Sequence, residues 1–132
     1  MRADLFQSGA FRLRSGQESS WKVETDALTD GDLETLARLI AKAVGPFRAV
    51  WGVPQGGCRL AEALLPYAQF YQPKLPALVC DDVLTSGASM EQTRAALLHP
   101  DTGNREVVGV VLFARSPCPP WVRAVWELGE WL

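Results

Sequence analysis

The chain has 132 residues, 48% of them hydrophobic and 21% charged, and a formal net charge of −2. This length and composition predict one folded domain over residues 1–132 and exclude a disordered segment. The acidic balance argues against nucleic acid as a partner, because phosphate backbones are bound by clustered Lys and Arg in excess.

The first predicted elements are two short extended pieces, Phe11–Arg14 and Trp21–Glu24, joined by the turn-prone segment SGQESS. A helix follows, and Thr29 with Asp32 forms the capping box that begins it. The sequence Gly45-Pro46 ends this helix. Its apolar residues recur at helical spacing: Leu33, Leu36, Ala37, Ile40 and Val44.

Beyond this helix the chain alternates strands and helices. Strands are predicted at Phe47–Val53, Ala77–Cys80, Glu106–Ala114 and Val122–Leu128, and helices at Cys58–Ala68 and Ala88–His99. This order is typical of right-handed βαβ units and predicts an α/β fold with a doubly wound, mainly parallel sheet. Residues 1–24 and 115–132 are expected to form a small hood or edge elements.

Two loops are expected at one rim of the sheet. PQGG and LTSGAS each leave the carboxyl end of a predicted strand and enter a helix, and ligands of such folds bind at that edge. In LTSGAS, small residues leave backbone N–H groups accessible beside hydroxyls and a helix start, which suits a phosphate. The alternative is an ordinary turn in which Ser86 or Ser89 caps the helix.

Asp81 and Asp82 lie just before this loop, with Val83 between them and Leu84. Two adjacent carboxylates after a buried strand repel each other and need partners. Sugar hydroxyls and Mg²⁺ both fit, so the stretch VCDDVLTSGASM indicates a ribose 5-phosphate site. The alternative is a solvated acidic pair that caps a neighbouring helix.

PQGG is a candidate for a second phosphate group. Gly52, Gly56 and Gly57 let backbone amides converge on an anion, and Pro54 stiffens the approach. The alternative is a plain turn between a strand and a helix. Opposite a second loop of the same kind, PQGG is expected to hold a pyrophosphate.

These residues resemble a known family. VCDDVLTSGAS is similar to the phosphoribosyl pyrophosphate (PRPP) motif of type I phosphoribosyltransferases, and WGVPQGG is similar to their pyrophosphate loop. GAFRLRSGQESSWKVE resembles the opening segment of orotate phosphoribosyltransferases, and the strand that ends in FAR resembles the one closing their core. The resemblance runs from about Leu5 to Arg115.

The resemblance implies a reaction in which Mg²⁺-bound PRPP loses pyrophosphate from ribose C1 through an oxocarbenium-like state while a nitrogenous base attacks. Asp81 and Asp82 would hold the ribose hydroxyls and, largely through water and substrate, the metal. The 5-phosphate would be cradled by Thr85, Ser86, Gly87, Ala88 and Ser89, and the pyrophosphate by Pro54, Gln55, Gly56 and Gly57.

For the base, the resemblance points to Arg14 and Arg115, whose guanidinium groups would suit an acidic ring. The alternative is that both arginines form surface or interface ion pairs. Lys22 and Val23 occupy positions where the orotate enzymes usually carry aromatic residues, which puts orotate itself in doubt.

The family normally has a long mobile loop before the PRPP motif, which closes over the site and supplies a catalytic basic residue. Here that connection is only QFYQPKLPA, with Lys74 as its single charge. Either Lys74, Arg59 or a partner chain takes the role of the loop, or turnover is weak or lost. Lys74 therefore joins Asp81 and Asp82 as a candidate catalytic residue.

Two functions follow: a phosphoribosyltransferase, or a PRPP or nucleotide sensor without efficient chemistry. A regulatory nucleic-acid-binding relative is disfavoured by the acidic balance. The scattered cysteines Cys58, Cys80 and Cys118, with His99 as the only histidine, argue against zinc and for a reduced, cytoplasmic protein. No signal peptide or membrane span is expected. A homodimer is expected, with Trp121, Trp126 and Trp131 as core or subunit-contact residues.

Overall fold

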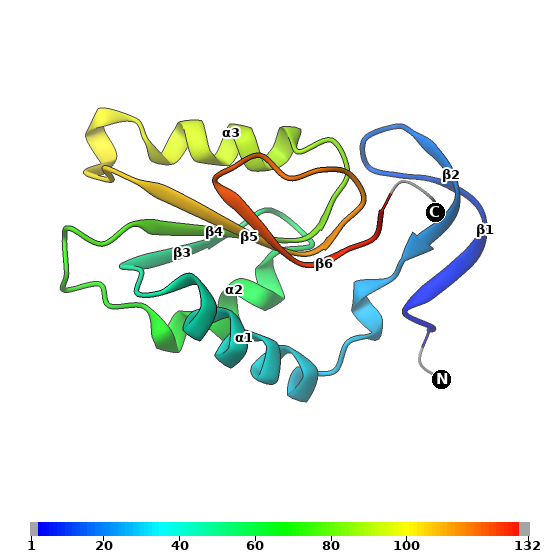
Figure 1. The fold of residues 1–132 in the computed structure, drawn as a ribbon, viewed down its shortest axis with the longest axis horizontal. Coiled ribbons are helices and arrows are strands. Elements are labelled where there is room, and N and C mark those ends of the chain that lie inside the picture. The colour runs from blue at the N-terminus through cyan, green and yellow to red at the C-terminus, as the bar shows by residue number, and fades with distance from the viewer. Residues whose placement is uncertain (1–2, 130–132) are drawn as a thin grey trace.

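The computed structural model describes residues 3–129, which form a central four-stranded sheet, its flanking helices and a separate two-stranded hairpin (Figure 1). Trp131 lies outside the described residues. The elements are β1 (Phe6–Arg12), β2 (Glu18–Val23), α1 (Asp30–Val44), β3 (Ala49–Gly52), α2 (Cys58–Leu64), β4 (Ala77–Leu84), α3 (Ala88–Leu97), β5 (Val107–Ala114) and β6 (Val122–Glu127).

The central sheet is parallel throughout, with the strand order β3-β4-β5-β6. Helices α1 and α2 cover one face of this sheet and α3 covers the other (Figure 1). The prediction of a doubly wound α/β fold is therefore confirmed. Among the described residues, no helix is long and apolar enough to cross a membrane.

Alternate residues of β4 divide the core into two halves, because neighbouring side chains of a strand point to opposite faces. Leu78 and Cys80 pack against α1 and α2, whereas Ala77 and Val79 pack against α3. Burial on both faces explains why β4 and β5 are almost continuously apolar.

The two crossovers of the sheet differ in hand. The β3–α2–β4 and β4–α3–β5 units advance in the same direction across the sheet, yet α2 and α3 cover opposite faces. Such units have opposite hands, so the prediction of right-handed units is wrong for one of them. As a consequence, the chain enters β4 from one face and leaves it on the other, and the carboxyl end of β4 lies between the starts of both helices.

Several boundaries differ from the sequence prediction. Strand β4 extends to Leu84 rather than ending at Cys80, because β5 continues to pair with it as far as Leu84 opposite Ala114. Asp81 and Asp82 therefore lie inside a strand. Helix α2 ends at Leu64 and continues as a short 3₁₀ turn, Leu65–Tyr67, that accommodates Pro66. Strand β1 begins at Phe6, five residues before the predicted Phe11, and β2 begins at Glu18, within the predicted turn, because the two strands pair with each other there. Smaller differences occur at the ends of β3, α3, β5 and β6.

The hairpin of β1 and β2 lies beside the carboxyl end of the central sheet (Figure 1). The ring of Phe6 meets Phe113 of β5 edge-on, with centroids 5.8 Å apart, and Phe113 stacks on Trp126 of β6 at 5.0 Å. The capping box predicted at the start of α1 is present, since Thr29 and Asp32 exchange side chain–backbone hydrogen bonds of 2.9 and 3.0 Å. The hairpin and α1 thus enclose one side of the sheet's carboxyl edge.

Candidate functional site

A cavity of about 630 Å³ opens at the carboxyl end of β4. The hairpin, the loop before α2 and the loop before α3 surround it, so the two loops expected at one rim do meet there. The predicted site residues that line it are Arg14, Gln55, Gly56, Asp81, Asp82, Thr85, Ser86, Gly87, Ala88, Ser89 and Arg115.

The loop between β4 and α3 depends on Gly87. Its φ of +83° lies in the left-handed region, which residues other than glycine rarely adopt. The hydroxyl of Ser86 accepts a hydrogen bond of 3.3 Å from the N–H of Ala88, and the hydroxyl of Ser116 donates to the carbonyl of Thr85. Gly87 is the N-cap of α3 and no side chain of the described residues caps this helix, so the alternative in which Ser86 or Ser89 caps it is not realised, and the loop lines the cavity.

The two acids are buried, each with 5% of its surface exposed. One oxygen of Asp81 accepts the N–H of Asp82 at 2.8 Å, and one oxygen of Asp82 accepts the N–H of Val83 at 2.8 Å. Burial, together with the hydrogen bond and charge of Asp82, raises the pKa of Asp81 from 3.8 to about 8. The folded state therefore favours the protonated form of Asp81 more than the unfolded chain does.

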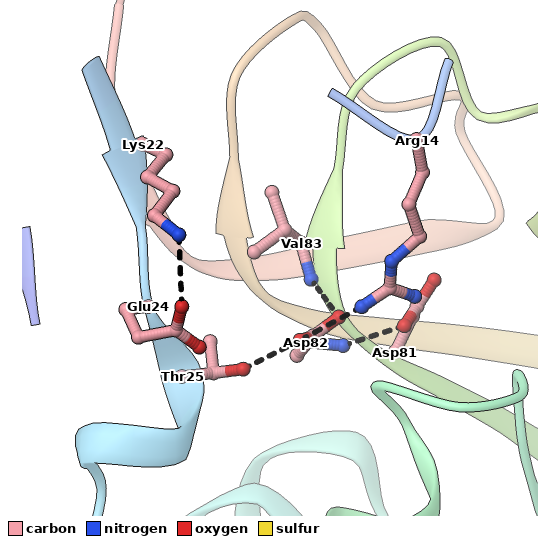
Figure 2. Close-up of polar contacts among 7 residues, drawn as sticks. All are labelled: Arg14, Lys22, Glu24, Thr25, Asp81, Asp82 and Val83. Carbon is pink, nitrogen blue, oxygen red and sulfur yellow. Dashed lines mark hydrogen bonds and ion pairs between the residues drawn. The ribbon is translucent and has the colours of Figure 1, made fainter. Parts of the chain in front are cut away.

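The carboxylate of Asp82 is where separate parts of the chain meet. The hydroxyl of Thr25 donates to its Oδ2 at 2.6 Å, and a guanidinium nitrogen of Arg14 lies 3.7 Å from the same oxygen (Figure 2). Gly56 packs so closely that a Cβ there would overlap the carboxylate. Asp82 thus connects the hairpin turn, the segment after β2 and the loop before α2.

The loop before α2 brings Gln55 and Gly56 to the cavity, but Pro54 and Gly57 do not line it. Gly57 is buried, and its N–H donates to the carbonyl of Val53 at 2.8 Å. A Cβ at Gly57 would overlap the carbonyl of Cys80. This glycine therefore permits close packing of the loop on β4, and its amide is used inside the turn. The Pro54–Gln55 peptide bond is cis.

The two arginines predicted for the base lie differently. Arg14 is largely exposed, with 69% of its side chain accessible, and forms the ion pair with Asp82. Arg115 covers the ring of Trp21 at 3.6 Å and donates to the Trp21 carbonyl at 3.2 Å and to the Ser19 hydroxyl at 2.6 Å. Burial lowers the pKa of the Arg115 guanidinium. Both arginines line the cavity, and the ion pair of Arg14 is with the buried Asp82 rather than with a surface carboxylate; their role toward a base stays a prediction.

Comparison with solved structures relates this architecture to known enzymes. Orotate phosphoribosyltransferase of Mycobacterium tuberculosis, in complex with inorganic phosphate, is similar with a TM-score of 0.68 and 21% identity over 92% of this chain and 87% of that one. Orotate phosphoribosyltransferase of Aeropyrum pernix is similar with a TM-score of 0.64 and 23% identity over 85% of this chain and 76% of that one.

A phosphoribosyltransferase of Corynebacterium diphtheriae is similar with a TM-score of 0.66 and 19% identity over 84% of each chain. The chain has the type I phosphoribosyltransferase fold. No family model and no curated protein matches its sequence. At these identities, the similarity establishes the fold.

The connection between α2 and β4 is short, and it stands where the resemblance predicts a long mobile loop before the PRPP motif. Its ends are fixed, since the N–H of Gln69 donates to Phe47 and that of Arg48 donates to Pro76. Lys74 is exposed and lies before the amino end of β4, whereas the cavity lies at the carboxyl end of this strand and Lys74 does not line it. The structure therefore does not bring Lys74 to the candidate site.

Arg59, unlike Lys74, lines the cavity. Its guanidinium donates to the carbonyl of Leu28 at 2.9 Å and to the carboxylate of Asp30 at 3.2 Å. Of the two basic residues considered as replacements for the mobile loop, Arg59 is the one that the structure places at the site.

Sequence reasoning missed the side chains that β2 and its following turn contribute. Lys22 and Glu24 line the cavity and form an ion pair of 3.0 Å (Figure 2). The ammonium of Lys22 lies over the ring of Phe11. Thr25 also lines it. No local pattern marks these residues, because Thr25 and Asp82 are 57 positions apart. Lys22 and Glu24 lie within the segment that resembles the orotate enzymes and Thr25 directly follows it, and this placement is the only signal that the sequence offers.

Proposed function

We propose that the protein is a Mg²⁺-dependent phosphoribosyltransferase that transfers the phosphoribosyl group of PRPP to a nitrogenous base and releases pyrophosphate. One observation carries the proposal: the acidic pair of β4 and the loop of residues 85–89 line one cavity at the carboxyl end of a phosphoribosyltransferase fold. A carboxylate pair beside a phosphate-binding loop matches a sugar that carries both hydroxyls and a phosphate.

Each part of PRPP has a matching set of groups in this proposal. The N-terminus of α3 and the hydroxyls of the preceding loop would hold the 5-phosphate, because unpaired backbone N–H groups and the positive end of the helix dipole favour an anion at that position. Asp81 and Asp82 would accept hydrogen bonds from the ribose hydroxyls. Gln55 and Gly56, on the opposite rim, would hold the pyrophosphate. The enzyme's contribution is mainly orientation and charge stabilisation.

The residues present fit a magnesium ion. Within residues 3–129, no group of three or more His, Cys, Asp or Glu side chains could hold a metal. Mg²⁺, however, is commonly bound by one or two carboxylates together with substrate phosphates and water, which matches Asp81 and Asp82 beside a pyrophosphate. The ion, when bound, would neutralise charge on the leaving pyrophosphate.

The hairpin side of the cavity is the proposed base site. Arg14, Lys22, Glu24 and Arg115 line it there and offer both donors and acceptors to the edge of a ring. A heterocycle with polar or acidic edges, such as a pyrimidine resembling orotate, fits this set better than a purely apolar ring.

The same proposal includes a homodimer. Leu65, Phe70 and Tyr71, in and after the 3₁₀ turn that follows α2, expose 61%, 82% and 67% of their surface. Apolar and aromatic groups gathered in this way are typical of subunit contacts. Light scattering would measure the mass in solution.

One observation favours the second candidate, a PRPP sensor with little activity. The short connection before β4 is tied down at both ends and Lys74 does not line the cavity, so this connection is not placed to close over bound substrate.

Release of pyrophosphate separates the two functions. The protein would be incubated with Mg²⁺ and PRPP across a panel of pyrimidine and purine bases, both acidic and neutral. The proposed transferase releases pyrophosphate with at least one base, and release depends on that base. Binding of PRPP without release for any base would contradict the transferase and support the sensor.

A further inference from the structure

We propose that Thr25 is a positioning residue that holds the Asp82 carboxylate in the orientation that receives the ribose hydroxyls, an inference that rests on the proposed function. Thr25 begins the 3₁₀ turn Thr25–Ala27 between β2 and α1. Its hydroxyl donates to Oδ2 of Asp82 at 2.6 Å, which is the length of a strong hydrogen bond to a carboxylate (Figure 2).

Two donors on different oxygens fix the plane of this carboxylate. Oδ1 accepts the N–H of Val83 at 2.8 Å, and Oδ2 accepts the hydroxyl of Thr25. Rotation about the Cβ–Cγ bond would break both contacts at once. Because each carboxylate oxygen can accept about two hydrogen bonds, each keeps acceptor capacity for a ligand in the cavity.

Arg14 does not hold the Asp82 carboxylate in its orientation as Thr25 does. Its nitrogen lies 3.7 Å from Oδ2, beyond hydrogen-bond distance, and 69% of its side chain is exposed. A guanidinium also offsets the negative charge that a cation or a sugar hydroxyl would use. The neutral hydroxyl of Thr25 orients the carboxylate and leaves its charge available.

The backbone of the turn places the Thr25 hydroxyl independently of Asp82. The N–H of Leu28 donates to the carbonyl of Thr25 at 3.0 Å, and the N–H of Ala27 donates to that of Glu24 at 3.1 Å. Arg59 binds the carbonyl of Leu28 and so joins the turn to α2. Replacing Thr25 with Val keeps this backbone and the shape of the side chain, and removes only the hydroxyl.

Calorimetric titration with ribose 5-phosphate and with inorganic phosphate tests the inference. Thr25→Val is expected to bind ribose 5-phosphate about tenfold more weakly, since a hydrogen bond to a charged group is lost. Its affinity for inorganic phosphate should not change, because phosphate binds at the loop of residues 85–89. Thr25→Ser keeps the hydroxyl and should bind both ligands within about twofold of the unmodified protein.

Thr93→Val is the matched control, because the Thr93 hydroxyl donates to a backbone carbonyl within α3 and does not line the cavity. Thr25→Ala replaces Thr25→Val if the latter unfolds. Any of three results would overturn the positioning role. The variant without the hydroxyl could bind ribose 5-phosphate as tightly as the unmodified protein, Thr25→Ser could lose as much ribose 5-phosphate affinity as Thr25→Val, or Thr25→Val could lose as much affinity for inorganic phosphate as for ribose 5-phosphate. If the unmodified protein binds neither ribose 5-phosphate nor PRPP, the proposed function fails and this inference with it.

Discussion

Gly56→Ala tests how tightly the loop before α2 packs on the acidic pair. A Cβ at Gly56 would overlap the Oδ1, Cγ and Oδ2 atoms of Asp82. Gly56 is not among the glycines with positive φ, so alanine can adopt its backbone conformation. The perturbation is therefore a collision with one carboxylate.

The magnitude follows from the contacts that Asp82 would lose. Its carboxylate must rotate away from the new methyl group, which breaks the hydrogen bonds from Thr25 and Val83. Hydrogen bonds to charged groups are worth about 1.5–3 kcal/mol, and overpacking costs about 1–3 kcal/mol. Because both hydrogen bonds are lost, we expect the free energy of unfolding to fall by at least about 3 kcal/mol and PRPP affinity to fall at least about tenfold.

Urea unfolding and calorimetric titration with PRPP and Mg²⁺ measure the two effects. Gly31→Ala is the matched control, because the nearest atom to its new Cβ would be 3.8 Å away and no loss of stability is expected. Unchanged stability and unchanged affinity in Gly56→Ala would refute the close packing of Gly56 on Asp82.

Two further predictions concern charged groups at the site. Because the folded state keeps a proton on Asp81 that the unfolded chain releases, the free energy of unfolding should fall as pH rises from about 4 to about 8. Urea titrations at a series of pH values measure this slope, and Asp81→Asn should remove it. An identical slope in the variant would assign the pH dependence to another group. Arg115→Lys should lower the free energy of unfolding by about 1–2 kcal/mol, because stacking on Trp21 and one hydrogen bond are lost. Arg38→Lys, at an exposed position on α1, is its control in the same assay, and equal values for both would contradict the role of stacking.

Local patterns predicted the parts of the fold that depend on near neighbours in sequence. The capping box of Thr29 and Asp32 and the loop around Gly87 are determined within a few residues, so composition and spacing were enough to locate them. The same holds for the alternation of strands and helices, which indicated the doubly wound sheet before any pairing was known.

What the sequence could not reveal depends on contacts between distant segments. The extension of β4 to Leu84 is set by pairing with β5, and the hydrogen bond from Thr25 to Asp82 joins separate segments. The buried role of Gly57 likewise depends on the Cys80 carbonyl beneath it. The prediction of Lys74 rests on its charge and on its place in the connection that replaces the mobile loop, and only the direction of β4 shows that it lies at the opposite edge from the cavity.

The central claim is that the acidic pair and the loop of residues 85–89 form one PRPP site, and calorimetric titration with PRPP tests it most directly. The account predicts saturable binding that requires Mg²⁺, is lost in the double variant Asp81→Asn/Asp82→Asn, and is retained in Asp101→Asn, whose carboxylate is exposed in the turn after α3. Absence of binding in the unmodified protein, or binding that survives the double substitution, would contradict the account.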